Sequence, residues 1–218
     1  MKLSELFKRC LNAKYLPVEQ DGDYGFELEG RRLYLYFQWS DEKRDWFNNF
    51  DFFPKKYGGV GTEWYCHRGY LRVWESMKPS VREIMQKYDG YIDEVFVIGY
   101  SHGAALATIA FDWVWYNYPH LRDRVIGYGF GAPRVYFGFM NKDLKARWFN
   151  FHPVRDGVDI VTHVPFALLG FRHVNKIVKV GNCRRPVKSH YPGKYMEALE
   201  KSGLQAEFAK TYAEMHNA

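Results

Sequence analysis

One serine of the chain lies in a pattern that is typical of a catalytic nucleophile. Ser101 lies between two glycines in the sequence Gly99-Tyr100-Ser101-His102-Gly103. A sharp strand-to-helix turn strains the backbone of such a serine, so the residues two before and two after it must be small. The turn exposes the hydroxyl and points a helix N-terminus at any anion that forms there. An apolar run at 94–99 precedes Ser101 and a helical pattern at 103–118 follows it, so the sequence predicts a nucleophile rather than a structural turn.

A serine nucleophile needs a base, and the base needs a carboxylate that orients it. In an α/β-hydrolase these follow the serine in the order Ser, Asp or Glu, His. Asp156 and Asp159 both come just after an expected strand, and spacing alone does not separate them. The histidines after the serine are His102, His120, His152, His163, His173, His190 and His216.

Six stretches in order along the chain, the serine elbow among them, resemble the motifs of one family. They are Tyr36-Phe37-Gln38-Trp39-Ser40 with Asp45-Trp46, His67-Arg68-Gly69-Tyr70-Leu71, the elbow at 99–107, Phe130-Gly131-Ala132-Pro133-Arg134-Val135, the segment 159–165, and Gly170-Phe171-Arg172-His173. The family patterns are F-R-G-[ST] and D-W, H-x-G-F-L, G-H-S-L-G-G-A-L-A, F-G-A-P-R-V, D-x-V-x-x-x-P and G-[FY]-x-H. Taken together they resemble the class 3 lipase family of α/β-hydrolases, from about Leu33 to the region of Leu199.

The resemblance implies a role for each matching residue. Ser101 is the nucleophile, Asp159 the acid of the triad, and Asp156 a loop residue. The family's base lies late in the chain in an H-x-x-Y-like context, which favours His190, and His173 is the alternative base. The backbone N–H groups of Ser40 and His102 are expected to form the oxyanion hole, where one donor is typically worth about 10²–10³ in rate. His67 leads into a helix, so a structural role is expected for it.

The segment after the oxyanion residue forms a lid over the acyl site in the related lipases. Here that segment is 41–53, in which Trp46, Phe47 and Phe50 would make the apolar face, and a fixed surface helix is the equal alternative. Three positions depart from the family pattern: Trp39 replaces Gly, His102 replaces Leu, and Ala104 replaces Gly. Because the backbone N–H groups survive, these changes are expected to reshape the acyl entrance rather than remove hydrolysis.

The remaining pattern predicts strands that alternate with helices, which is typical of an α/β fold with a largely parallel sheet. We expect one α/β-hydrolase domain over 1–218, with the sheet flanked by helices. Expected helices are 3–16, 69–88 divided at Pro79, 103–118, a short one near Lys142, and 192–216 with a weak point at Gly203. Expected strands are 26–28 and 33–37 as a hairpin, 94–99, 124–130, 148–154 and 174–180, with a loop at 54–61.

Composition limits the class of partner. Aromatic residues make up 19% of the chain and are expected mainly in the core, with an apolar ligand surface as the alternative. The net charge of +6 comes from scattered basic residues without a nucleic-acid-binding motif, so no nucleic acid is expected, and weak attraction to anionic lipid headgroups stays open. Three widely spaced cysteines and no apolar leader or membrane span predict a cytoplasmic protein.

The glycine-rich stretches do not match nucleotide sites, and the histidines and cysteines lack zinc spacing, so no cofactor and no metal are expected. The sequence therefore predicts a serine hydrolase that cleaves carboxylic esters, and the favoured substrates are lipid esters such as acylglycerols or phospholipids. Thioesterase or acyltransferase activity on the same triad is the alternative within enzymes. A degenerate hydrolase that serves as a binding module is the alternative outside them.

Overall fold

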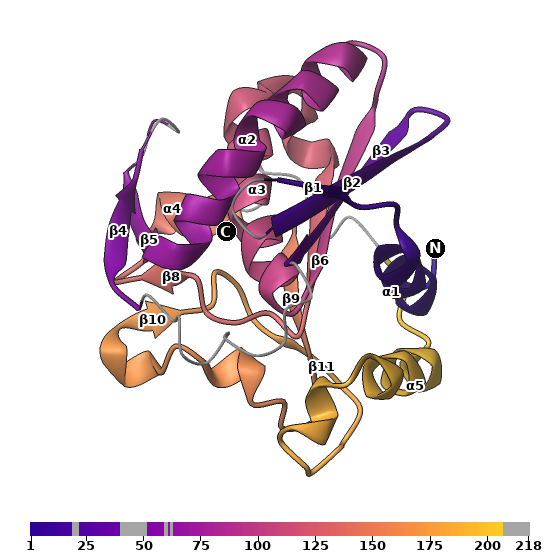
Figure 1. Ribbon diagram of the computed structural model, residues 1–218, viewed down its shortest axis with the longest axis vertical. Helices are drawn as coiled ribbons and strands as arrows, with labels where there is room; N and C mark the ends of the chain where they lie inside the picture. The colour runs from indigo at the N-terminus through magenta and orange to yellow at the C-terminus, as the bar shows by residue number, and fades with distance from the viewer. Residues whose placement is uncertain (19–21, 40–51, 59–60, 62, 207–218) are drawn as a thin grey trace.

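The computed structural model describes residues 1–18, 22–39, 52–58, 61 and 63–206 (Figure 1). Five α-helices are assigned in these residues: α1 Leu3–Asn12, α2 Arg68–Tyr88, α3 His102–Asn117, α4 Lys142–Arg147 and α5 Pro192–Ser202. Short 3-10 helices are η1 Pro119–Arg124, η2 Val161–His163, η3 Ala167–Leu169 and η4 Lys188–His190. The strands are β1 Leu16–Pro17, β2 Gly22–Glu29, β3 Arg32–Trp39, β4 Pro54–Tyr57, β5 Trp64–His67, β6 Glu94–Tyr100, β7 Val125–Phe130, β8 Tyr136–Phe137, β9 Phe151–Asp156, β10 Phe171–Arg172 and β11 Val178–Val180.

The central sheet has seven strands in the order β1-β2-β3-β6-β7-β9-β11. Strands β3, β6, β7, β9 and β11 run parallel, while β1 and β2 form an antiparallel edge. Helices α2 and α3 cover one face of this sheet and α1 and α5 cover the other (Figure 1). This is the α/β-hydrolase architecture with a largely parallel sheet that the sequence predicts.

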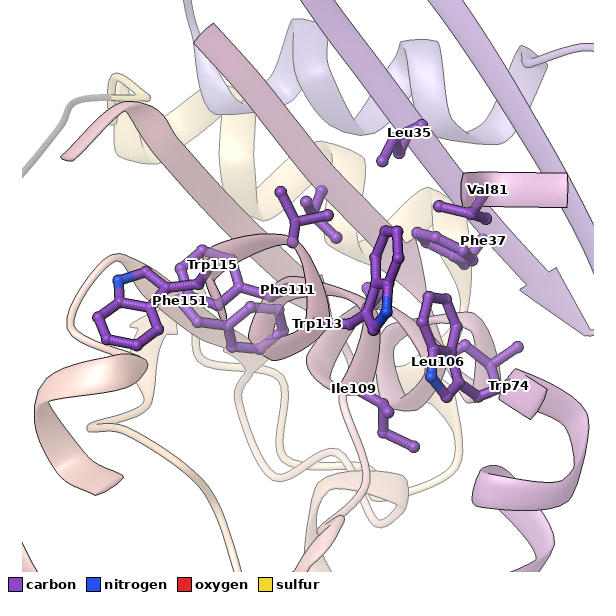
Figure 2. Close-up of a cluster of buried hydrophobic side chains, with 14 of the residues drawn as sticks. Leu35, Phe37, Trp74, Val81, Leu106, Ile109, Phe111, Trp113, Trp115 and Phe151 are labelled. Carbon is purple, nitrogen blue, oxygen red and sulfur yellow. The ribbon is translucent and has the colours of Figure 1, made fainter. Parts of the chain in front are cut away.

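The strands bury both faces because their side chains alternate between two cores. Leu33, Leu35 and Phe37 of β3 enter the core under α2 and α3, and Tyr34 and Tyr36 enter the core under α1 and α5. Helix α3 is apolar all round because it lies between the sheet and α2, and it is buried along most of its length. Figure 2 shows the aromatic character of this core, where Phe111, Trp113 and Trp115 gather with Phe37, Trp74 and Phe151.

The first and last described helices pack against each other behind the sheet. Phe7 of α1 contacts Tyr100, Phe130 and Tyr195, with ring centroids 5.5, 4.7 and 5.9 Å apart. The backbones on either side also join, since Leu3 N–H donates to the Leu204 carbonyl at 2.9 Å. Tyr195 belongs to α5, so this packing connects α1 to the elements near Ser101.

Several sequence expectations about elements are wrong in detail. Helix α2 runs through Pro79 without a division, because Pro79 lies on the exposed side while Met77 and Val81 pack into the core on either side of it. The expected loop at 54–61 contains β4, which pairs with β5. Strands β9 and β11 begin later than expected, and α5 ends at Gly203, whose positive φ of 63° closes the helix.

A second sheet, which the sequence did not predict, has four strands in the order β10-β8-β5-β4. It is antiparallel and lies beside the N-terminal end of α2, at the left of Figure 1. No helix in the part of the chain that the structure describes combines the length and apolar character needed to cross a membrane. Cys10, Cys66 and Cys183 are free thiols, and the cytoplasmic location stays a prediction.

Candidate active site

Ser101 occupies the turn between β6 and α3 in a strained backbone conformation. Its φ is 56° and its ψ is −124°, and among the described residues it is the only non-glycine with a positive φ. A Cβ on Gly99 would lie 2.2 Å from the Gly103 carbonyl oxygen, and a Cβ on Gly103 would lie 2.0 Å from the Phe37 carbonyl oxygen. Because no side chain fits at either position, this turn requires glycine at both 99 and 103.

The Ser101 hydroxyl meets an imidazole that comes from the far end of the chain. His190 lies in η4, after β11, and its Nε2 is 2.8 Å from Ser101 Oγ. His190 Nδ1 is 2.9 Å from Asp159 Oδ2, and the Asp159 side chain is fully buried. The structure therefore brings together Ser101, His190 and Asp159 at the carboxyl ends of parallel strands, where ligands bind in open α/β sheets.

Asp159 is held by two further donors. The Val161 N–H donates to Oδ1 at 2.9 Å, and the Tyr195 hydroxyl donates to Oδ2 at 2.5 Å. Burial and the neighbouring Asp159 charge raise the pKa of Tyr195 well above its ordinary value, so this phenol stays a donor. With these bonds the carboxylate is fixed, and it holds the Nδ1–H tautomer of His190 that leaves Nε2 able to accept a proton.

Two residues support the imidazole itself. Tyr100 stacks on the His190 ring, with centroids 5.2 Å apart and planes 18° apart, and its hydroxyl donates to the His190 carbonyl. Gly131 adopts a φ of 61°, and a Cβ there would lie 3.0 Å from His190 Cε1. Tyr100, Gly131 and Tyr195 are not predicted as site residues from the sequence. Tyr100 and Gly131 lie within stretches that carry the family resemblance, and Tyr195 follows His190 by five residues.

His102 begins α3 directly after Ser101. The N–H groups of a first helical turn point out of the helix end, which is where an oxyanion beside Ser101 would lie. The His102 ring is buried near Tyr70, at 5.9 Å between centroids. Burial, with the nearby His190 and His67 adding to it, lowers the pKa of His102 to about 4, so this ring is neutral at physiological pH.

The other residues considered from the sequence have different surroundings. His67 caps α2, with Nδ1 accepting from the Gly69 N–H at 3.1 Å. His173 Nε2 is 2.8 Å from the Thr162 carbonyl oxygen, and the structure does not bring its ring to the serine. Asp156 ends β9 and is buried beside Gly181 rather than at the imidazole, and burial raises its pKa.

The expected second oxyanion donor and residues 41–51 of the expected lid at 41–53 lie outside the described residues. These are Ser40, Trp46, Phe47 and Phe50, together with the side chain of Trp39, whose backbone ends β3. The end of β3 does lie against the elbow, because the Phe37 carbonyl is next to Gly103. The roles expected for these residues therefore stay predictions.

Comparisons with known proteins place the chain in a family. The model of the family "Lipase (class 3)" matches residues 34–169. The triacylglyceride lipase of Rhizomucor miehei is 21% identical, with a TM-score of 0.65 over 77% of this chain and 64% of that chain. Lipase II of Rhizopus niveus is 23% identical, with a TM-score of 0.62 over 80% of this chain and 68% of that one.

The lipase of Rhizopus microsporus var. chinensis is 22% identical, with a TM-score of 0.62 over 83% of this chain and 65% of that chain. A search of curated proteins found no match. The chain thus spans about two thirds of the length of these fungal enzymes, 64% in the case of the Rhizomucor lipase, and they share its fold. Because the family model covers more than half of the 218 residues, the chain belongs to the class 3 lipase family.

Proposed function

We propose that the chain is a serine hydrolase that cleaves carboxylic esters of lipid type, such as acylglycerols or phospholipids. The observation that carries this proposal is the chain of hydrogen bonds from Ser101 through His190 to Asp159. His190 Nε2 lies 2.8 Å from Ser101 Oγ, and His190 Nδ1 lies 2.9 Å from Asp159 Oδ2. Membership of the class 3 lipase family supports it. A triacylglycerol lipase with the same fold is described as having a serine protease triad as its catalytic centre.

In the proposed reaction Ser101 Oγ attacks the ester carbonyl carbon while His190 Nε2 takes the hydroxyl proton. The carbonyl oxygen becomes an oxyanion, which the N–H groups of His102 and Ser40 would hold. The carbon–oxygen bond to the alcohol then breaks, and His190 gives its proton to that oxygen. Water attacks the acyl-enzyme with His190 as base, which releases the acid and restores Ser101.

The neutral state of His102 favours this chemistry. A cation beside His190 would oppose the imidazolium that forms in the transition state. Because burial keeps the pKa of His102 at about 4, His102 adds no such charge above that pH. Its ring lies where the family has leucine, so we propose that it affects which acyl groups fit rather than proton transfer.

Fluorophosphonate labelling tests the proposal. Wild type should label, and Ser101→Ala should not, while Ser76→Ala in α2 serves as a control serine and should label normally. His190→Ala should lose labelling and His173→Ala should retain it. Hydrolysis of a soluble ester should fall by about 10⁴–10⁶ in Ser101→Ala.

The same assay separates the alternatives. If the wild-type protein is folded but does not label, the proposed hydrolase function is contradicted and a binding module is favoured. A thioester cleaved faster than its matched ester would favour a thioesterase, and ester formation with an added alcohol would favour an acyltransferase. Loss of labelling with His173→Ala but not with His190→Ala would overturn the choice of base.

A further inference from the structure

The base and the acid of the proposed triad lie on two separate loops. His190 belongs to η4, a single 3-10 turn, and Asp159 lies between β9 and η2. Because neither residue belongs to a long helix or strand, contacts between the loops must maintain the 2.9 Å separation of His190 Nδ1 from Asp159 Oδ2. Residues 183–186, which follow β11, contact both loops and are called the bridging segment below.

On the side of the acid, the bridging segment accepts two backbone hydrogen bonds. The Cys183 carbonyl accepts from the Val158 N–H at 3.0 Å, and the Pro186 carbonyl accepts from the Ile160 N–H at 3.2 Å. Val158 and Ile160 are the neighbours of Asp159 in the chain. The bridging segment therefore holds the backbone of the acid from both sides.

On the side of the base, the bridging segment meets the Ser189 side chain. Ser189 lies directly before His190 and is fully buried. Its Oγ lies 2.9 Å from the Arg185 carbonyl oxygen and 3.1 Å from the Cys183 carbonyl oxygen, so one hydroxyl hydrogen is shared between two acceptors. The Ser189 N–H also donates to the Arg185 carbonyl, at 2.8 Å. The hydroxyl thus adds a link to Cys183 that the backbone of η4 does not make.

The Cys183 carbonyl is the point where the two sets of contacts meet. It accepts from the Val158 N–H, next to the acid, and from the Ser189 hydroxyl, next to the base. The acid loop approaches this carbonyl very closely at Gly157, which has a φ of 44°, and a Cβ there would lie 2.0 Å from the Cys183 oxygen. Only glycine permits this approach. A single carbonyl oxygen therefore links the loop of the acid to the turn of the base.

A buried hydroxyl that donates to a backbone carbonyl often has only a local use. Ser76 is an example, since its Oγ donates to the Val73 carbonyl at 2.7 Å within helix α2. Ser189 differs because the Cys183 carbonyl lies outside η4 and is shared with the loop of the acid. The same type of bond therefore stabilises one helix in the first case and joins two loops of the proposed site in the second.

The bonds that would remain without the hydroxyl show what it contributes. The Tyr100 hydroxyl donates to the His190 carbonyl, and the N–H of residue 189 donates to the Arg185 carbonyl. Neither bond depends on the Ser189 side chain, so Ser189→Ala is expected to fold with η4 formed. What this variant loses is the link between η4 and the Cys183 carbonyl.

We propose that Ser189 is a positioning residue of the triad, whose hydroxyl holds the turn of His190 against the loop of Asp159. Without this hydroxyl the imidazole moves away from the carboxylate by a few tenths of an ångström. The inference rests on the proposed function and extends it to a residue outside the three reacting side chains.

The rate per active site tests the proposal. Fluorophosphonate titration, run to completion, counts the reactive sites, so that kcat refers to folded enzyme alone. In Ser189→Ala, kcat on a small soluble ester should fall by about tenfold with KM little changed, because a misplacement of about 1 Å costs about 100-fold. A purely structural role would lower the number of titrated sites and leave kcat per site at the wild-type value.

Two further variants complete the kinetic series. Ser76→Ala removes a hydroxyl-to-carbonyl bond of the same kind within α2 and should keep the wild-type kcat. Ser189→Cys retains a weak S–H donor, so its kcat should lie between those of Ser189→Ala and wild type. This variant also provides the measurement if Ser189→Ala does not fold.

Proton NMR follows the imidazole directly and needs no turnover. The Nδ1–H of His190, bonded to the buried Asp159 carboxylate, should give a low-field signal that His190→Gln lacks. Ser189→Ala should shift or broaden this signal, and Ser76→Ala should leave it unchanged.

The two measurements keep the proposals apart. If Ser189→Ala keeps more than half of the wild-type kcat per site, or leaves the imidazole signal unchanged, the positioning role is wrong while the hydrolase stands. If the folded wild type neither labels nor hydrolyses an ester, the proposed function is wrong. In that case a signal that changes in Ser189→Ala alone still supports the positioning role, and one that does not change overturns it.

Discussion

Gly131→Ala offers a sharp test of the arrangement around His190. The new methyl group would lie 3.0 Å from His190 Cε1, 3.1 Å from Nδ1 and 3.2 Å from Asp159 Oδ2. Contacts this short require a neighbour to move by a few tenths of an ångström. Asp159 is bonded to the Val161 N–H and the Tyr195 hydroxyl, so the imidazole is the group that moves.

The magnitude follows from two separate costs. Alanine at a φ of 61° destabilises the fold by about 1–2 kcal/mol, whatever the space around it. A misplacement of about 1 Å at a catalytic group costs about 100-fold in rate. A shift of a few tenths of an ångström should then lower kcat by about tenfold, with KM for a small soluble ester little changed.

Gly30→Ala is the matched control. Gly30 has nearly the same φ, 60°, and nothing lies within 4 Å of the position of its Cβ. Thermal unfolding should show a similar loss of stability in both variants, while only Gly131→Ala should lose activity in the ester assay. If Gly131→Ala keeps more than half of the wild-type kcat, the imidazole position described here is not the one that reacts.

Other changes test the supports of the site and of the fold. Tyr195→Phe removes one donor from Asp159 and should lower kcat severalfold and cost about 1–2 kcal/mol in a denaturant titration. Arg147 Nη2 lies 2.8 Å from the carboxylate of the fully buried Asp112, so Arg147→Leu removes the cation that pairs with Asp112 and should lower the free energy of unfolding by about 3–5 kcal/mol. The double variant Arg147→Leu with Asp112→Leu should regain much of that stability. Burial lowers the pKa of His152 to about 4, so the unfolded chain binds this proton first, and His152 should contribute about 1.4 kcal/mol per pH unit to the loss of stability as pH drops from 6.5 towards 4. His152→Phe should reduce that slope by one proton, and an unchanged slope would contradict a neutral buried ring.

The turn at Ser101 can be predicted from the sequence because the residues that it requires are close together in the chain. Gly99 and Gly103 are needed by contacts within one turn and the neighbouring strand, and such a pattern can be read in a pentapeptide. The choice between Asp156 and Asp159 could not be made from spacing, because it depends on contacts distant in sequence. Asp159 is held by Tyr195, 36 residues away, and from the sequence only the family resemblance favours Asp159 over Asp156.

The four-stranded sheet shows why part of the fold was missed. Strands β8 and β10 have two residues each, too short for an alternating pattern. Each exists because a distant segment supplies its hydrogen-bond partner, and β8 joins β5 to β10 across about a hundred residues of sequence. Pro79 was misjudged for a related reason, since packing on both sides of it stabilises α2 more than one missing backbone bond weakens it.

The packing of α1 on α5 has a consequence for the order in which activity appears. A ribosome releases α1 first and α5 last among the described helices, with the Ser101 elbow between them. Until α5 emerges, Phe7 lacks Tyr195 as a neighbour, and Asp159 lacks the hydroxyl that holds it. His190 itself emerges only just before α5. A growing chain therefore carries a serine without its base until the segment of His190 and α5 has emerged, and the proposed hydrolase can begin to act only after that.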